Sequence, residues 1–242
     1  LAWLGLLAAA IALGAARIAG VLAGTLHWAD VFTALLDGCF TLLRVLLVVL
    51  ISAAVWVPLG VWFGLRPRWA RWAQPVAQFL AAFPANLFFP LVVVVIVHFV
   101  LDPDIWLTPL MLLGTQWYIL FNVIAGAAAF PGDLKEAVAN FRVGGPLWWR
   151  RVMLPSIMPY LITGAITASG NAWNTAIVAE VASWGKTKLV AHGLGAYIAQ
   201  ASDAGDTPRI LLGVAVMAGF VLVFNRLLWR PLYAFSSRRM SL

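Results

Sequence analysis

The residues from Lys135 to Pro159 interrupt an otherwise apolar chain with charges and helix breakers. Four of the sixteen Lys and Arg residues fall in this segment. Its charged residues stand among apolar ones, and the chemistry that this mixture supports is binding to a charged or apolar surface. The first question that the sequence raises is what this segment contacts.

The segment predicts two short helices. Asp133 can cap a helix over 134–142, since a carboxylate is favourable at a helix N-terminus. Residues 143–146 (VGGP) break this helix, and a second one over 147–153 follows. Pro155 then ends the interruption, because proline cannot continue a helix from the preceding turn.

Three apolar residues of the first helix share one face. Leu134, Val138 and Phe141 are spaced i, i+4 and i+7. A helix this short is not stable alone in water, and burying each such side chain contributes about 1.5–3 kcal/mol. Either lipid headgroups or another protein is therefore expected to cover this stripe.

A second group of polar residues lies within apolar sequence. Thr163, Thr167, Asn171 and Asn174 fall on one face of a predicted helix. At bilayer depth this face must meet protein or water, so it either packs helices together or lines a route for a solute. The candidates for a translocation path are Asn86, Gln116, Thr163, Thr167, Asn171 and Asn174.

Other chemistries have little support in the sequence. The single Cys39 excludes a disulfide within the chain and a multi-cysteine metal site. His98 and His192 each lack a spaced partner, so no metal or haem site is expected. An intramembrane enzyme would need a nucleophile with a base, or paired histidines, and neither pattern is present.

The composition indicates an integral membrane protein. The chain is 63% hydrophobic and 10% charged, against roughly 25% charged in soluble domains. Its length allows five or six spans but no separate soluble domain, so residues 1–242 form one transmembrane domain. The predicted spans are about 2–24, 44–65, 76–101, 105–129, 157–183 and 209–229, and Trp28 to Leu43 is expected to form an interfacial helix.

The charges orient these spans. Segments 66–75 and 131–155 and the C-terminal tail hold ten of the sixteen basic residues, which predicts that they are cytoplasmic together with both termini. The net charge of +7 therefore does not imply nucleic acid as a partner. The outer stretch from Trp184 to Pro208 is long for a connection between spans. Its Lys186, Lys188 and His192 could contact an anionic solute or the acidic rim of a solute-binding protein, or the stretch could be an ordinary solvated loop. Glu180 is expected to pair with Lys186 or Lys188.

The charged segment resembles the EAA loop of ATP-binding-cassette importer permeases. That pattern is Glu-Ala-Ala, a Gly four residues after the second Ala, and then Leu-Pro with a further Pro. Glu136-Ala137-Val138, Leu154-Pro155 and Pro159 stand at its positions. The departures are Val138 for the second Ala and Arg142 at the usual Gly, and Gly144 and Gly145 follow shortly after, which predicts a displaced bend.

The resemblance covers about residues 40–235. Stretches at 41–45, 58–61, 64–65, 74–76 and 78–84 are similar to the nitrate, sulfonate and taurine permease branch, and 140–145 (NFRVGG) and 227–232 (LLWRPL) to its anion-transport members with duplicated permease halves. The chain begins at Leu1 rather than Met. This favours one half of a longer polypeptide, although a second copy or a homologue could also complete the transporter.

The resemblance implies the type I importer permease fold, which is all α with about six transmembrane helices. It also implies that the 133–155 loop docks on a cytoplasmic ATPase dimer through Leu134, Glu136, Ala137, Val138, Phe141, Arg142, Gly144, Gly145, Leu154 and Pro155. ATP and Mg²⁺ would bind that partner, because this chain lacks Gly-x-x-x-x-Gly-Lys-Ser/Thr. No cofactor is expected on this chain.

The remaining implications concern the assembly. The resemblance implies two protein partners, which are a second permease subunit or half and a solute-binding protein on the outer side. It also implies a location in the bacterial inner membrane, and a small anion such as nitrate, a sulfonate or bicarbonate as the solute. The alternative from another class is an autonomous channel or a proton-coupled secondary carrier. Such proteins normally have ionisable residues at mid-span, and the third to sixth predicted spans have none at their centres.

Overall fold

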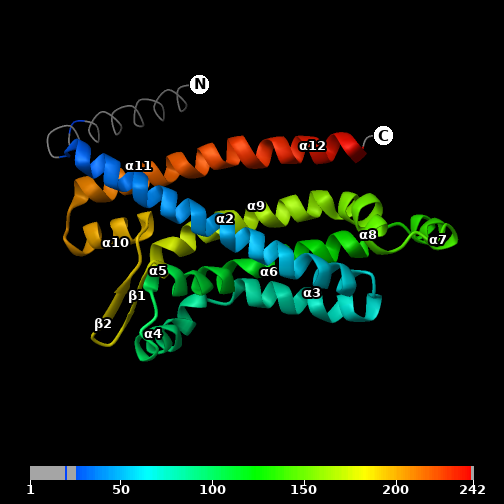
Figure 1. Cartoon of the computed structure of the whole chain (residues 1–242), viewed down its shortest axis with the longest axis horizontal. Helices are drawn as coiled ribbons and strands as arrows, with labels where there is room; N and C mark the ends of the chain where they lie inside the picture. Colours follow the sequence, from blue (N-terminus) through cyan, green and yellow to red (C-terminus); the bar gives the residue numbers. More distant parts are fainter. Residues whose placement is uncertain (1–19, 21–25, 241–242) are drawn as a thin grey trace, which may run out of the picture.

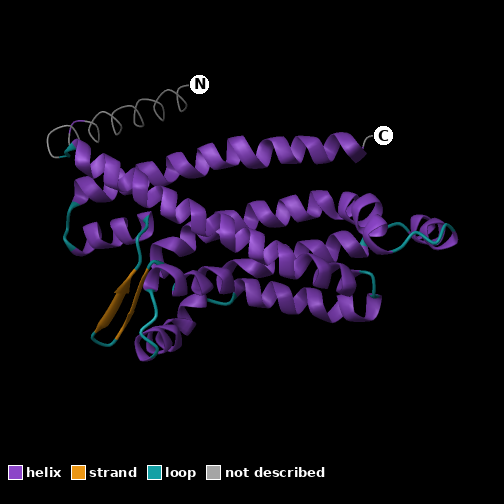
Figure 2. Cartoon of the chain, viewed as in Figure 1, coloured by secondary structure: helices purple, strands orange, loops and turns teal. Residues whose placement is uncertain are grey.

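The computed structural model describes residue 20 and residues 26–240, which form a bundle of long helices with one two-stranded hairpin (Figures 1 and 2). Within this part of the chain, four helices are long and apolar enough to cross a membrane, and one bent pair of helices makes a fifth candidate. The predicted helical transmembrane fold is confirmed. The first predicted span, about 2–24, lies outside the described residues apart from Gly20, so the total of six is not tested.

Helix α2 is a single helix of 37 residues, Trp28–Gly64. The expected interfacial helix ending at Leu43 was therefore wrong: the helix continues through Asp37 and Arg44 without a break. The physical reason is that Arg44 is buried and paired inside the bundle, so its charge does not have to leave the membrane-spanning part of the helix. At about 1.5 Å per residue, α2 is longer than a hydrocarbon layer of about 30 Å.

The third predicted span is broken. Helix α3 (Pro67–Ala82) and the residues of η1 (Ala85–Phe88) and α4 (Phe89–His98) meet at a bend of 77°. The break falls at Phe83 and Pro84, between the end of α3 and the start of η1. Phe83 has an extended backbone (ψ 129°), as a residue that precedes proline prefers, and this ends α3.

The interrupting segment protrudes between the fourth and fifth spans (Figure 1). Helices α5 (Pro103–Trp106) and α6 (Thr108–Ala128) precede the segment. The segment itself comprises α7 (Gly132–Asn140), α8 (Gly145–Trp148), the π-helical η2 (Trp149–Met153) and the start of α9 (Leu154–Ala179). Helix α7 starts before Asp133, which makes no capping hydrogen bond, so that expectation was wrong. The second short helix is not separate either, because α8, η2 and α9 form one helical run, Gly145–Ala179.

Pro155 does not interrupt this run. It lies in the first turn of α9, directly after the π-helical turn. The altered hydrogen-bonding pattern of a π turn accommodates a residue that has no N–H to donate.

The outer stretch is more ordered than a loop. Strands β1 (Val181–Trp184) and β2 (Thr187–Val190) pair antiparallel with Val181 opposite Val190, and Gly185 provides the positive φ of 61° in the two-residue turn. Helix α10 (Leu194–Asp203) follows the hairpin. The chain then completes the bundle with α11 (Thr207–Phe224), the π-helical η3 (Asn225–Trp229) and α12 (Arg230–Met240).

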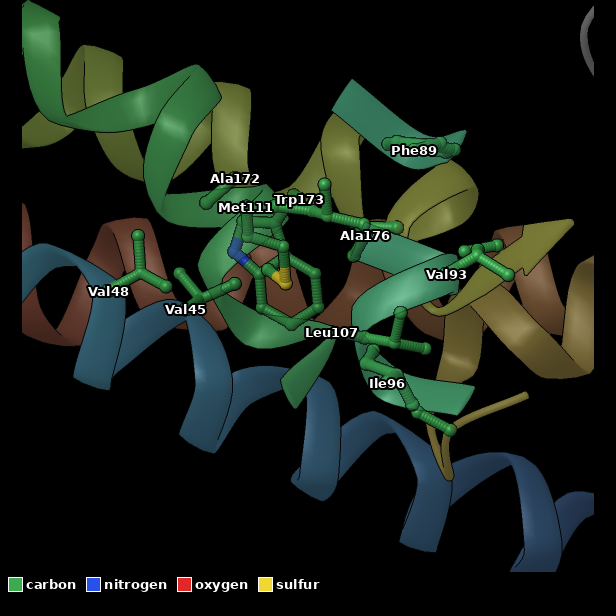
Figure 3. Packing of buried hydrophobic residues seen from close by; sticks show 14 residues of the cluster. Val45, Val48, Phe89, Val93, Ile96, Leu107, Met111, Ala172, Trp173 and Ala176 are labelled. Carbon is green, nitrogen blue, oxygen red and sulfur yellow. The ribbon is translucent and has the colours of Figure 1, made fainter. Parts of the chain in front are cut away.

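Helix α6 lies between α2 and α9 and packs closely on both. A Cβ at Gly64 of α2 would lie 2.6 Å from the Ile124 carbonyl oxygen, and one at Gly164 of α9 would lie 2.9 Å from the Tyr118 carbonyl oxygen. These contacts require glycine, as is common where membrane helices approach closely. Figure 3 shows the neighbouring apolar cluster, where Val45 of α2, Met111 of α6 and Trp173 of α9 are buried together.

Candidate functional site

Helix α7 carries the apolar stripe predicted from the sequence, and no other described element covers it. None of its residues is buried, and it makes no extensive contact with another described element. Leu134 is 51% exposed and Phe141, directly after the helix, is 81% exposed, whereas Val138 is half-buried. Glu136 and Lys135 are also exposed. The stripe is therefore available for a contact outside the described chain.

The turn that ends α7 lies at the residue where this chain departs from the family pattern, and its backbone conformation explains why Gly is usual there. Arg142 has a positive φ of 52°. The Arg142 N–H donates to the Ala139 carbonyl and the Val143 N–H to the Val138 carbonyl, which is the Schellman arrangement at a helix C-terminus. A glycine adopts this conformation without strain. The structure keeps a bend at position 142, where the family pattern has Gly, in addition to the one expected at Gly144 and Gly145. Gly145 supplies a second positive φ, of 59°.

The other predicted coupling residues lie within α7, in the turn that follows it and at the start of α9. Ala137 is half-buried, and Gly144, in extended backbone, is exposed. Leu154 and Pro155 are half-buried at the start of α9, beside the fully buried Met153 and Ile157. These two buried side chains anchor the protruding segment to the second apolar cluster of the bundle.

The bundle has two chemically different ends. The turn from α2 to α3, the α7–α8 segment and the C-terminal end of α12 lie at one end, and the hairpin, α4 and α10 lie at the other (Figure 1). The three basic segments identified from the sequence thus share one end. Which end faces the cytoplasm stays a prediction from the positive-inside rule.

Three of the six predicted path residues meet at one pocket. Asn86 from η1, and Asn171 and Asn174 from α9, line a pocket of about 380 Å³ beside the break at Pro84. The Asn171 amide donates to the Gly114 carbonyl at 3.0 Å, which fixes that side chain against α6. The proline break therefore opens a polar recess between α3, α6 and α9.

The other three path candidates do not join this pocket. Thr163 and Thr167 are exposed on α9, and their hydroxyls donate to the carbonyls of Pro159 and Thr163. Gln116 lies between α6 and α2, where its side-chain oxygen accepts a hydrogen bond from Trp56 Nε1 at 2.9 Å. Both interpretations of the α9 face, helix packing and solute path, fit an exposed row of threonines.

A buried charge cluster joins four elements near the hairpin. Arg44 of α2 and Glu180, directly after α9, form an ion pair at 2.9 Å, and both are nearly inaccessible at 7% and 1% exposure. Arg44 also contacts Asp104 of α5 at 3.1 Å, and the Thr41 hydroxyl donates to Glu180 at 2.8 Å. The expected pairing of Glu180 with Lys186 or Lys188 was wrong, and Lys188 pairs with Asp203 instead.

Glu180 also caps α10. Its Oε2 accepts hydrogen bonds from the backbone N–H groups of Gly195, at 2.7 Å, and Ala196, at 3.3 Å, so the carboxylate lies at the N-terminus of that helix. A Cβ at Gly193 would lie 2.3 Å from the Glu180 carboxyl carbon. In the sequence, the two glycines of Gly193-Leu194-Gly195 were the feature that could have indicated the close approach of the Glu180 carboxylate to the backbone.

His192 joins the cluster from the loop after β2. Its Nδ1 lies 2.7 Å from Asp104 Oδ2, and its backbone N–H donates to Asp104 Oδ1. The hydrogen bond to the Asp104 carboxylate, together with its charge, raises the pKa of His192 above the ordinary value of 6.5. The side chain itself is largely exposed, so water screens this pair.

These features define a class: a multi-span helical membrane protein with a polar recess along its spans and an uncovered amphipathic segment at its basic end. The chain belongs to the family of the binding-protein-dependent transport system inner membrane component, whose profile matches residues 56–241. The resemblance to ATP-binding-cassette importer permeases is therefore confirmed, and with it the type I permease fold. Members of this family are transport permeases rather than enzymes.

The chain is similar to permease proteins named for three different solutes. The chain is similar to the bicarbonate transport system permease protein CmpB of Synechococcus elongatus, with 24% identity over 73% of this chain and 60% of the relative. It is 22% identical to the nitrate import permease protein NrtB of Leptolyngbya laminosa, over 77% of this chain and 63% of the relative. It is also 26% identical to the glycine betaine/proline betaine transport system permease protein ProW of Escherichia coli, over 72% of this chain and 48% of the relative. The chain thus spans about three-fifths of the length of CmpB and NrtB and about half of ProW.

Proposed function

We propose that this chain is the transmembrane permease component of an ATP-driven importer for a small anion, such as nitrate, bicarbonate or a sulfonate. A second permease subunit or half would complete the path, and a solute-binding protein would deliver the solute on the outer side. The chain would lie in the bacterial inner membrane, with the 133–155 loop and both termini in the cytoplasm. ATP and Mg²⁺ would bind a separate ATPase dimer.

The observation that carries this proposal is the uncovered stripe of α7 in a chain of this family. Leu134 and Phe141 are exposed at the basic end of the bundle, on a helix too short to be stable in isolation. An apolar pair rimmed by Lys135, Glu136 and Arg142 suits a groove on a soluble protein. An ATPase docked there would transmit its closure to the spans as a rigid-body displacement.

The pocket at the break of α3 and α4 supports a solute path. Its polar groups are uncharged side chains, including those of Asn86, Asn171 and Asn174. Amide and hydroxyl groups can donate hydrogen bonds to an oxyanion without a fixed positive charge. Binding of this kind is weak enough for the solute to leave, as transport requires.

Copurification tests the docking contact. Affinity purification from native membranes is expected to recover Mg²⁺-dependent ATP hydrolysis with the unaltered chain, and Phe141→Asp or Glu136→Lys should remove it. Asn140→Asp is the matched control, because it places the same new side chain one residue away, outside the stripe. Retention of ATPase activity in both Phe141→Asp and Glu136→Lys would refute the docking assignment.

Uptake into proteoliposomes tests the transport function. Uptake that needs ATP, and is inhibited by nitrate, bicarbonate or a sulfonate but not by glycine betaine, is the expected result. Uptake without ATP would instead favour an autonomous carrier.

A further inference from the structure

A groove lined only by apolar side chains runs along α3, where this helix packs against α2 and α6 at the edge of the bundle (Figure 1). Its volume is about 270 Å³. Four of its lining side chains are tryptophans, which are Trp56 of α2, Trp69 and Trp72 of α3, and Trp117 of α6. The groove shares no residue with the asparagine-lined pocket, so the two are separate features.

The length of the groove matches one leaflet of a bilayer. On α3 its lining residues extend from Trp69 to Leu80, which are 11 residues apart, so the groove runs for about 16 Å at about 1.5 Å per residue. Half of a hydrocarbon core of about 30 Å is about 15 Å. The rim is open, since Trp72 is 77% exposed and Val76 is 53% exposed. An apolar chain can therefore enter from the side of the bundle.

Three arginines at the start of α3 have no acidic partner. Arg66, Arg68 and Arg71 are exposed and form no ion pair within the described chain. The sequence between Asp37 and Asp102 contains no acidic residue. The first turn of α3 also lacks one, so the positive end of the helix dipole adds to the arginine charges. This end of the groove therefore has unbalanced positive charge.

Aromatic contacts place this charge at the mouth of the groove. The Arg66 guanidinium lies 4.3 Å from the centre of the Trp62 ring. That ring is 5.7 Å from the ring of Trp69, which lines the groove. Arg68 precedes Trp72 by four residues, so the two lie on one face of α3. A ligand that suits both features has a negative headgroup joined to an apolar chain.

We propose that this groove binds an anionic phospholipid, with one acyl chain along α3 and the phosphate at Arg66 and Arg68. Basic side chains at a membrane surface attract anionic headgroups, and the guanidinium fork matches phosphate oxygens. A lipid suits the groove better than a soluble partner does, because the groove follows α3 along the bundle instead of lying beyond its end. The site does not depend on the proposed transport function, since its evidence is the shape, exposure and charge around α3.

Native mass spectrometry of the purified protein tests the headgroup contact. The protein is mixed in detergent with equal amounts of dioleoyl phosphatidylglycerol and dioleoyl phosphatidylcholine, which have the same acyl chains, and the retained lipid is identified by its mass. Phosphatidylglycerol is expected to be preferred roughly tenfold or more, because hydrogen bonds between charged groups are the strong ones. Arg66→Gln combined with Arg68→Gln should abolish the preference. Arg150→Gln combined with Arg151→Gln is the control, since it removes two exposed arginines of η2 and should leave the preference unchanged.

A second pair of variants tests the acyl-chain contact. Val76→Trp fills the groove from its exposed rim and should reduce retention of phosphatidylglycerol about tenfold with all arginines present. Phe79→Trp is the matched control, because it places the same side chain on an exposed part of α3 that does not line the groove. If Val76→Trp does not fold, Ala73→Leu fills the groove in its place.

The remaining outcomes identify a different occupant. Glycerol 3-phosphate has the phosphate without the chains and should not displace the lipid; displacement would assign the arginines to a free phosphate. A lipid-free dimer that Val76→Trp abolishes would assign the groove to a second copy of the chain. Either result, equal retention of the two lipids, or a preference that survives loss of Arg66 and Arg68 would overturn the proposal. Uptake does not enter any of these measurements, so failure of the proposed transport function is a separate result.

Discussion

At the residue scale, the pair of Arg44 and Glu180 is the most consequential feature. Removing two charges from water costs several kcal/mol per ion, and good geometry with further hydrogen bonds has to offset this cost. Here Thr41 and the N-terminal N–H groups of α10 supply those bonds. The pair therefore determines how α2, α9 and α10 fit together as well as contributing to stability.

We expect Glu180→Ala to destabilise the protein by about 3 kcal/mol, because it leaves the Arg44 charge buried with Asp104 as its remaining partner. Unfolding by denaturant in detergent measures the change in free energy. Asp203→Ala is the control, since its pair with Lys188 is exposed and should contribute less than about 1 kcal/mol. A loss for Glu180→Ala no larger than that of the control would show that the buried pair is not stabilising.

The pair of His192 and Asp104 should make stability depend on pH. The pKa of His192 is raised in the folded protein, so the stabilisation is fully present below the unfolded value of about 6.5 and is lost as pH rises through the folded value. The melting temperatures of the unaltered protein and His192→Gln should therefore differ most below pH 6 and converge as the pH rises above the folded pKa of His192. A His192→Gln difference that is independent of pH would contradict this assignment.

At the element scale, the glycines of α2 determine the distance between α2 and α6. Gly64→Val would place side-chain atoms against the Ile124 carbonyl and Ala127, so α2 must move away from α6. The variant should lose folded yield and thermal stability in detergent. Gly219→Val in α11 is the matched control, because nothing lies within 4 Å of the Cβ it would add. Equal stability of the two variants would show that the close approach is not required.

Long apolar helices were predictable from the sequence, and elements determined by distant partners were not. Helices α6 and α9 follow from apolar length and from the breakers that flank them. The continuity of α2 through Arg44 was missed because the partner, Glu180, lies 136 residues away. The hairpin was missed because its strands have only four residues each and no strong alternation.

The candidate sites also differ in whether local sequence was enough to predict them. The stripe of α7 depends on helical spacing within nine residues, so the sequence was sufficient to predict it. The pocket around Asn86 and Asn171 needed the bend of the third span to bring η1 beside α9. The groove along α3 needed α2, α3 and α6 to pack together, and no local pattern indicates such an arrangement.

At the scale of the whole molecule, the two ends of the bundle should lie on opposite sides of the membrane. In a Cys39→Ser background, Lys186→Cys should react with an impermeant maleimide on intact spheroplasts, and Leu134→Cys only in inverted vesicles. The reason is that basic segments are retained in the cytoplasm. Labelling of both positions from the same side would exclude the assigned topology.

The helical run from Gly145 to Ala179 connects these two ends without a loop. Its 35 residues span about 50 Å at 1.5 Å per residue. It begins directly beside α7 and ends at Glu180, whose carboxylate is bonded to Arg44. A tilt imposed on its first turn would therefore shift the carboxylate at its other end, so a force applied to the α7 end of the bundle would reach the ion pair at the hairpin end.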